Sequence, residues 1–462
     1  MTTNAQGMGD SILAPASRSA PCPCGSGRRY KDCHGSLSAT SSAPDIGIRA
    51  HQLALQGLSA QQSQDLAQAV TLYEAALKLD PDHSDALHML GVVHYELSDA
   101  ATAVPMIMRA LDLTGWTLAA MRNNLGLALA KLTRNDGAPE HGLTRKGREY
   151  RAGLSAMQAL ATTHQPFAVA PLVSVVVPSY NHASYLRQAL QSVYAQTYRE
   201  IELIVIDDGS TDASAAIARD VLRHCPFPHQ FVARENRGAH ATLNEAIGLS
   251  NGAYVNPLNS DDAFAATRIE AMVAATKRYG AALAFSSIDW IEAQSDAIDP
   301  FTDARVYVQL CKQSDIAFQE TVGNALLLHN VATTTGNLFF SRELFNALNG
   351  FRAFRYNHDW DFCLRALWLT EPVHVDQPLY RYRFHGRNTI SESTDNARNE
   401  AMRVVNEYLE RAFDPTDMGV QYTPNIAQWR ERFVTQVLAH GLAASLSPQV
   451  LKTYAQRLLA AE

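Results

Sequence analysis

The central part of the chain is predicted to be an α/β domain on a mostly parallel sheet, from three observations in residues 172–212. Two short β-branched runs, 173–177 and 201–206, lack polar alternation, as strands covered on both faces do. Between them, apolar residues recur at helical spacing from Tyr185 to Val193. A right-handed crossover through that helix makes the two strands parallel. We therefore expect a Rossmann-like sheet that binds its ligands at the carboxyl ends of the strands.

Polar loops follow each expected strand. Residues 178–181, Pro-Ser-Tyr-Asn, end the first strand, and residues 207–210, Asp-Asp-Gly-Ser, end the second. A third strand is expected at 230–233. A fourth, at 254–258, ends at Asn-Ser-Asp-Asp, residues 259–262. Carboxylates packed at such an edge are costly unless something positive binds them, so this edge is the predicted ligand site.

Composition sets the broad class of the protein. The chain has 462 residues, 47% of them hydrophobic, and a formal net charge of −7. At about 150 residues per domain, roughly three domains are expected. The negative charge and the lack of a basic block argue against nucleic-acid binding. The chain shows no secretory signal and no apolar run near the roughly 18 residues of a membrane span. We expect a cytoplasmic protein, with peripheral association at the inner face of the membrane as the alternative.

A group of metal ligands lies near the start of the chain. Cys22, Cys24, Cys33 and His34 suit tetrahedral Zn²⁺. The spacing resembles the SEC-C motif, which implies a zinc knuckle over residues 21–36. Because four protein ligands leave no open position for a substrate, this zinc would be structural or part of a docking module. The alternative is ordinary reduced cysteines in a flexible tail.

The flanking segments have simple compositions. Residues 1–20 are rich in Ser, Ala, Thr and Gly and are predicted to be disordered, and residues 37–48 are predicted to be a linker. An amphipathic helix is expected at 143–161, before a domain boundary at 165–171. Residues 396–462 show helical spacing of apolar side chains and are predicted to be a helical extension.

Residues 49–165 are predicted to be a helical domain with internal repeats. Residues 76–80 and 110–114 are similar and lie 34 positions apart, and the Leu-Gly pairs at 90–91 and 125–126 lie 35 apart. This period resembles tetratricopeptide repeats. It implies either a concave surface for a protein partner or a helical module that holds the chain together or dimerises it.

Four sequence blocks in fixed order carry a second resemblance. They are VSVVVPSYN at 173–181, VIDDGSTD at 205–212, the stretch from ENRGAHATLNEA to NSDD at 235–262, and HDWDFCLRA at 358–366, which YRFHGRNTIS follows at 382–391. Together they resemble the family 2 glycosyltransferases. The resemblance implies a GT-A catalytic domain over residues 172–395. It also implies a hexosyl transfer from a nucleotide-diphospho-sugar donor.

The resemblance assigns a donor pocket and a catalytic Mn²⁺ or Mg²⁺. Asp261 and Asp262 would divide the metal and ribose contacts between them, in either order. Many family members have Asp where this chain has Asn259, so metal affinity is predicted to be weaker unless Asn259 only hydrogen-bonds the sugar or ribose. The structural alternative is that the two aspartates cap a helix that starts near Arg268. The assigned donor-binding residues are Pro178, Tyr180, Asp207, Asp208, Asn236, Gly238, Asn244, Asn259, Asp261 and His385. Of these, Asp208 is assigned to the uracil or ribose edge.

A catalytic base is expected near residue 358. Most relatives carry Glu-Asp where this chain has His358 and Asp359, and Asp359 keeps the matching carboxylate. It is the predicted base that takes the acceptor hydroxyl proton, with Asp361 as the next candidate. Burial would have to raise the pKa of this carboxyl for that role. The alternative is an aspartate that caps the helix from Trp360.

These features together predict an inverting, metal-dependent glycosyltransferase. The acceptor would be a hydroxyl of a protein or of a lipid-linked glycan, and a protein fits the repeats slightly better. The alternative is a non-catalytic protein that binds a nucleotide sugar or acts as a scaffold through its repeats, which the unusual Asn259 and His358 favour.

Overall fold

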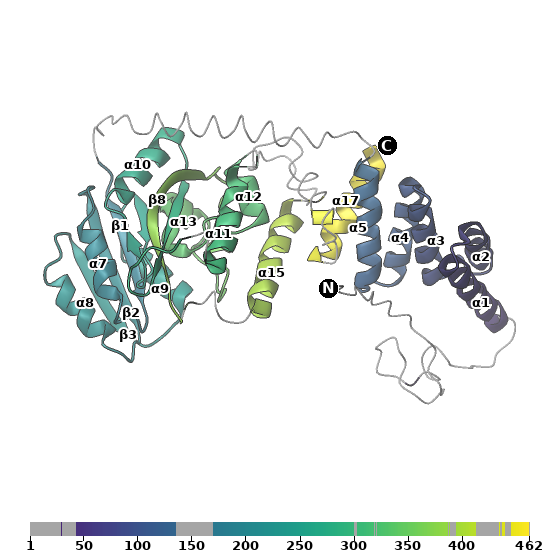
Figure 1. Cartoon of the computed structure of the whole chain (residues 1–462), viewed down its shortest axis with the longest axis horizontal. Coiled ribbons are helices and arrows are strands. Elements are labelled where there is room, and N and C mark those ends of the chain that lie inside the picture. Colours follow the sequence, from purple (N-terminus) through teal and green to yellow (C-terminus); the bar gives the residue numbers. More distant parts are fainter. Residues whose placement is uncertain are drawn as a thin grey trace. The chain divides into compact units, whose positions relative to one another are not determined.

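The computed structural model describes residues 29, 43–134, 170–299, 303–317, 319, 321–386, 388, 394–412, 434, 437–438 and 445–461 (Figure 1). The chain divides into two compact units, 1–128 and 129–462, and each is treated by itself. The predicted disordered tail at 1–20, the predicted zinc ligands Cys22, Cys24, Cys33 and His34, and the predicted helix at 143–161 lie outside the described residues. None of the helices in the described ranges has the length and apolar character that a membrane crossing requires.

The first unit is built mainly from two packed helix pairs. The first pair is α1 (Ala43–Gln62) with α2 (Leu66–Leu79), and the second is α3 (Ser84–Glu96) with α4 (Ala100–Leu113). Helix α5 (Ala119–Arg134) crosses the boundary between the two units. Helix α1 takes in the second half of the predicted linker at 37–48, since the proline in its first turn is compatible with a helix start. Pro81 separates α2 from α3. Asp65 and Asp99 occupy the same position of successive repeats, and their carboxylates accept capping hydrogen bonds from Gln68 N and Thr102 N at 3.1 Å.

Two glycines let the helices of each pair approach closely. A Cβ on Gly57 would lie 2.8 Å from the ring of Tyr73, and a Cβ on Gly91 would lie 2.6 Å from Ile107. Gly91 lies 34 positions after Gly57, and Ile107 lies 34 positions after Tyr73. The 34-residue period in the sequence therefore reflects a repeated helix contact, in which a small residue of one helix receives a large side chain of the next.

The second unit contains an eight-stranded mixed sheet of order β3-β2-β1-β4-β7-β6-β8-β5. Its strands are β1 (Val173–Ser179), β2 (Ile201–Asp208), β3 (His229–Arg234), β4 (Tyr254–Pro257), β5 (Ala263–Phe264), β6 (Leu283–Glu292), β7 (Phe339–Ser341) and β8 (Val373–Phe384). The four strands predicted from sequence are confirmed, and β1 pairs in parallel with β2 and β4, as β2 does with β3. The short strand β7 pairs antiparallel with β4 and β6, and β8 lies parallel to β6.

Helices cover both faces of this sheet. The helices are α7 (Leu186–Tyr194), α8 (Ser214–Leu222), α9 (Ala239–Gly248), α10 (Arg268–Tyr279), α11 (Ala304–Ser314), α12 (Val322–Leu328), α13 (Arg342–Ala347) and α14 (His358–Ala366), with short turns η2 (Asp315–Ala317) and η3 (Thr335–Asn337). Leu186, Ala218 and Ile269 of α7, α8 and α10 share one core cluster with Val173 and Val175 of β1. Helix α9 contacts β1 and β2 outside that cluster. Covered faces explain why β1 and β2 read as continuous apolar runs.

The C-terminal helices pack within the second unit. Helix α15 (Thr394–Ala412) packs against both α14 and α17 (Pro448–Ala461). The rings of Trp368 and Tyr408 lie 4.5 Å apart, and Val405 and Leu409 are buried as their helical spacing predicts. Asn406 holds the start of α17 by accepting a hydrogen bond from Ser447 N at 2.7 Å. Helices α15 and α17 lie in the segment that was predicted to be a helical extension.

Candidate active site

The acidic loop after β4 places its two aspartates in different surroundings. Asp262 is 1% exposed, and its carboxylate accepts hydrogen bonds from the Tyr380 hydroxyl at 2.6 Å, from Arg383 N at 2.8 Å and from Asn259 Nδ2 at 3.1 Å. Burial and the charge of Asp261 raise the pKa of Asp262 well above its ordinary value, against those hydrogen bonds. The protein itself thus satisfies both oxygens of this side chain.

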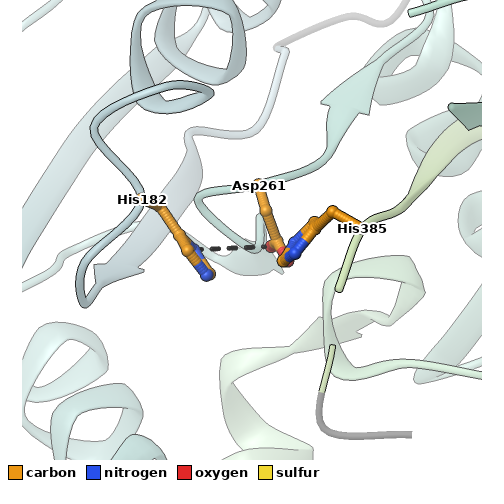
Figure 2. Close-up of side chains that lie close together, drawn as sticks. All are labelled: His182, Asp261 and His385. Carbon is orange, nitrogen blue, oxygen red and sulfur yellow. Dashed lines mark hydrogen bonds and ion pairs between the residues drawn. The ribbon is translucent and has the colours of Figure 1, made fainter. Parts of the chain in front are cut away.

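Asp261 points instead toward two histidines (Figure 2). Its Oδ2 lies 3.0 Å from Nε2 of His385, and its Oδ1 lies 3.8 Å from Nδ1 of His182. Burial acts to raise the pKa of Asp261, but the hydrogen bond from His385 and the charges of both histidines outweigh it and lower that pKa. His182 comes from the loop after β1 and His385 from the end of β8. Three segments far apart in sequence therefore meet at one carboxylate.

The alternative that the acidic loop caps α10 is wrong. Helix α10 begins at Arg268, after Thr267, and is too far along the chain for either aspartate to cap it. Asn259 has a structural task as well, because its amide donates to Asp262 and, at 2.7 Å, to the Thr334 hydroxyl.

The neighbouring aspartates at the end of β2 also differ. Asp208 forms an ion pair with Arg234 and accepts hydrogen bonds from Arg237 N at 2.8 Å and Gly238 N at 3.0 Å. Asp207 accepts a hydrogen bond only from Ser210 N, and its Oδ2 is buried without a partner among the described residues. The same holds for the hydroxyl of Ser179, which is the register partner of Asp207 on β1. Two adjacent, unsatisfied polar groups therefore face the edge of the sheet.

The other predicted donor-binding residues lie around this edge with one exception. Pro178 is half-buried in β1, while Tyr180 and Asn236 are exposed on loops. Gly238 has a φ of 86° before α9, a conformation that favours glycine. Asn244 is different, because its amide exchanges two hydrogen bonds with the backbone of Phe351, at 2.8 and 2.9 Å. It ties α9 to the segment before α14.

The two candidate bases on α14 have contrasting partners. Asp361 is 0% exposed and forms ion pairs with both Arg352 and Arg365. Asp359 is 6% exposed and accepts hydrogen bonds from Trp360 N at 2.7 Å and Asn330 Nδ2 at 3.0 Å, without a lysine or arginine partner among the described residues. Burial raises the pKa of Asp359, although the charge of His358 and these hydrogen bonds oppose it.

The turn η3 links the acidic loop to the candidate base. Thr334 accepts from Asn259, and the next residue, Thr335, lies 2.8 Å from Nε2 of His358. Gly336 follows, and a Cβ there would lie 1.9 Å from the Tyr380 hydroxyl. The pKa of Tyr382 is raised, mainly by burial and further by the charges of Asp262, Asp261 and Asp359. Tyr382 therefore lies close to both the acidic loop and the candidate base.

Sequence reasoning missed His182, Ser260 and Tyr380 as members of this site. His182 directly follows the loop at 178–181, which contains the predicted donor-binding residues Pro178 and Tyr180, so its place at the sheet edge was available as a signal. No such signal pointed to Tyr380, because that side chain is 118 positions from Asp262 in sequence. His358 was noted only as a departure from the family pattern, and burial lowers its pKa, which favours the neutral ring.

Comparisons with known proteins identify the parts of the chain. Residues 174–356 match the model of glycosyl transferase family 2. Residues 18–36 match the SEC-C motif, and residues 53–83 and 72–104 match tetratricopeptide repeat models. Chondroitin synthase of Escherichia coli is 25% identical over 243 residues, which cover 52% of this chain and 33% of that protein. Glycosyltransferase GlyA of Streptococcus pneumoniae is 26% identical over 289 residues, covering 60% of this chain and 39% of that protein.

The chain thus spans between a third and two fifths of the length of these two relatives. Among solved structures, the mannosyltransferase PcManGT of Pyrobaculum calidifontis, in complex with GDP-Man and Mn²⁺, aligns with a TM-score of 0.40 at 19% identity, over 69% of this chain and 86% of that one. TarS 1-349 of S. aureus, in complex with UDP-GlcNAc, aligns with a TM-score of 0.40 at 16% identity, over 62% of this chain and 89% of that one. The central part of the chain, residues 174–356, is thus similar to glycosyl transferase family 2, and the segments before it are similar to a SEC-C motif and to tetratricopeptide repeats.

Proposed function

We propose that the protein transfers a sugar from a nucleotide-diphospho-sugar to an acceptor hydroxyl with inversion at the anomeric carbon. The observation that carries the proposal is Asp359, a buried carboxylate with a raised pKa and no arginine partner among the described residues. Asp361, two positions on, is held by two arginines. Of these two aspartates, Asp359 is the one that can gain a proton at modest cost, which is what a general base requires.

The reaction is a single displacement. The acceptor oxygen forms a bond to the anomeric carbon while the bond from that carbon to the diphosphate oxygen breaks, and Asp359 takes the acceptor proton. When bound, Mn²⁺ or Mg²⁺ neutralises the charge of the departing diphosphate. The chain's own residues orient the donor. Asp207 is favoured over Asp208 for the base edge, since Asp207 Oδ2 lacks a partner among the described residues and can accept an N–H from the nucleobase.

The decisive experiment is a panel of UDP-, dTDP- and GDP-sugars with Mn²⁺, assayed for release of nucleoside diphosphate and for labelled product. Extracts of cytosolic protein and of lipid serve as acceptors, and the full chain is compared with one that starts at Pro171. We expect label in protein and a loss of that label without the repeats, because tetratricopeptide arrays present surfaces suited to extended polypeptide. Label only in lipid, unchanged without the repeats, contradicts the protein acceptor. No turnover with any donor contradicts the transferase and favours a binding or scaffold protein.

We also propose that the SEC-C motif binds one structural Zn²⁺ through Cys22, Cys24, Cys33 and His34. Three thiolates and an imidazole are a typical closed zinc site. Metal analysis should find one zinc per full chain and none in a chain that starts at Ser41, with transferase activity retained. Loss of activity in the shorter chain would mean that the knuckle is not a peripheral module.

A further inference from the structure

Asn330, in the turn that follows α12, contacts the candidate base directly. Its amide Nδ2 donates a hydrogen bond to Oδ2 of Asp359 at 3.0 Å. We propose that Asn330 is a positioning residue for Asp359, whose carboxylate it holds in place and supports in the ionised form that can take a proton. The inference deepens the proposed function and rests on it, because it assigns a partner to the base of that reaction.

The side chain of Asn330 has no other hydrogen bond among the described residues. Its Oδ1 is buried and has no partner there. Helix α12 does not use the side chain either, because the helix is capped by His329, whose backbone N–H donates to Ala325 O at 3.1 Å. A buried amide oxygen without a partner destabilises a fold, so packing alone does not account for an asparagine at this position. The contact with Asp359 does.

Each oxygen of the Asp359 carboxylate has one hydrogen-bond donor. Oδ1 accepts the backbone N–H of Trp360 at 2.7 Å, and Oδ2 accepts the Asn330 amide. The Trp360 contact fixes the carboxylate only relative to its own helix, whereas Asn330 fixes it relative to a segment 29 positions earlier. A carboxylate oxygen accepts more than one hydrogen bond, so the acceptor hydroxyl can still donate to Asp359.

The segment that carries Asn330 is anchored on both sides. Before it, Leu326 O of α12 accepts the indole N–H of Trp360 at 2.7 Å, which is a second link between α12 and α14. After it, the buried guanidinium of Arg268 donates to Oδ1 and to the backbone oxygen of Asn337, at 3.1 and 2.8 Å. An anchored partner holds a reactive group in one orientation, which a base in a displacement reaction requires.

The contact also has an electrostatic effect. Burial raises the pKa of Asp359, while the charge of His358 and the hydrogen bonds from Trp360 and Asn330 lower it. Without the Asn330 amide, the pKa of Asp359 should therefore rise further. The other titratable groups that respond to the charge of Asp359 are His358 and Cys363 of α14 and Tyr382 of β8.

Of these groups, Cys363 and Tyr382 remain neutral in the acidic pH range, because burial raises the pKa of both well above the ordinary value. His358 can titrate there. Burial lowers its pKa, and the charges of His240 of α9 and Glu400 of α15 act on it as well as that of Asp359. A measurement must therefore distinguish Asp359 from His358, which substitution of Asp359 itself does.

The first test is the pH profile of turnover, with the sugar nucleotide that reacts in the donor panel at saturation. Asn330→Ala should lower kcat about 10-fold with little change in the KM for the donor, and should move the acidic limb of the profile to higher pH. Asn330→Asp keeps the shape and adds a negative charge, so it should move that limb farther in the same direction. Asn324→Ala is the matched control and should leave the limb in place, because the amide of this α12 asparagine donates to Gln319 instead. An unchanged limb in folded Asn330→Ala and Asn330→Asp overturns the positioning role.

The second test needs no turnover and measures the free energy of unfolding in urea at several pH values. A higher folded-state pKa of Asp359 lowers stability only above the unfolded value of about 3.9. The destabilisation caused by Asn330→Ala should therefore be smallest in acid and grow as pH rises through the folded-state pKa of Asp359. In an Asp359→Asn background the same change should have an effect that does not vary with pH, whereas an effect through His358 would persist there.

The two tests separate the two ideas. A destabilisation by Asn330→Ala that does not vary with pH overturns the inference, whether or not the protein turns over any donor. A destabilisation that grows with pH only when Asp359 is present, in a protein that turns over no donor, supports the contact and its effect on Asp359 and contradicts the transferase function alone.

Discussion

Glu400 accepts a hydrogen bond from the backbone N–H of Tyr356 at 2.8 Å, and it thereby ties α15 to the loop that leads into the helix of Asp359. The same carboxylate accepts the N–H groups of Arg355 at 3.1 Å and Asn357 at 3.3 Å. One acidic side chain of the C-terminal extension thus fixes three successive amides just before α14. The extension, to which the sequence assigned no chemistry, contributes to the position of the candidate base.

Glu400→Ala should lower turnover about 10-fold and leave the KM for the donor nearly unchanged. Its partners precede Asp359 and are separate from the acidic loop, and a small displacement of a base is costly for the chemical step alone. Steady-state kinetics with a varied donor measure both constants. Glu410→Ala, exposed on the same helix, is the control. Equal losses in the two variants, or a raised KM with normal turnover, would refute a positioning role for Glu400.

Asp359→Asn should reduce turnover on the order of 10²-fold or more with little change in donor affinity, because only the transition state needs the proton acceptor. Asp361→Asn is the matched comparison. It should act mainly on stability, since it weakens contacts with Arg352 and Arg365. Turnover lost in Asp361→Asn but kept in Asp359→Asn would reverse the assignment of the base.

Turnover should fall as pH decreases through the raised pKa of Asp359, at a pH above the ordinary value of about 3.9. The stability that Asp359 contributes to folding should depend on pH in the opposite direction to turnover. A carboxyl whose folded-state pKa is raised favours folding below its unfolded pKa, and this contribution is lost as pH rises toward the folded value. Asp359→Asn should therefore unfold at a higher temperature than wild type near neutral pH, and the difference should shrink toward pH 4. A difference that grows on acidification contradicts the raised pKa.

Asn259→Asp, which restores the residue that many relatives have, should destabilise the protein by on the order of 3 kcal/mol. The change removes the amide that donates to Asp262 and Thr334 and adds a second charge beside a buried carboxyl. Asn259→Ala, which loses the same donors without the charge, should cost less. Urea unfolding compares the three proteins. Wild-type stability combined with tighter Mn²⁺ binding in Asn259→Asp would show that residue 259 is a ligand position after all.

Gly91→Ala should destabilise the repeat unit by about 1–3 kcal/mol, because its Cβ would lie 2.6 Å from Ile107 and 3.1 Å from a backbone oxygen of Ala103. Gly47→Ala meets nothing within 4 Å in α1 and should be neutral or stabilising by up to about 1 kcal/mol. Thermal unfolding of the full chain distinguishes them. The same loss in both variants would mean that the close contact with α4 is not what requires a glycine at residue 91.

The strands and loops of the catalytic domain were predictable because each depends on neighbouring residues. The β-branched runs of β1 and β2 and the polar segments after them are local, and they place Asp207 and Asp261 at one edge of the sheet. Asp65 and Asp99 likewise mark helix starts within a few residues of their partners.

Which aspartates the protein itself pairs, and which it leaves for a ligand, was not predictable, because their partners are distant in sequence. Asp262 is satisfied by Tyr380 and Arg383 of β8, a strand that pairs with β6 through a register shift. Asp208 is neutralised by an arginine of β3. A sequence shows that carboxylates gather at an edge, but their local pattern does not distinguish those that contact arginine or tyrosine from those that remain for a ligand.

The convergence of His182 and His385 on Asp261 has a consequence for biosynthesis. The two histidines are separated by 203 positions (385 − 182), so a ribosome adding about 5–20 residues per second needs roughly 10–40 seconds between them. Late in that interval the nascent chain has its first strands and its acidic loop, but β8 has not yet been made to supply the hydrogen-bond donors to Asp262 or the second imidazole. An unfinished chain therefore cannot form the complete cluster of His182, Asp261 and His385. The cluster is completed only after β8, the last strand of the sheet along the chain, has been made.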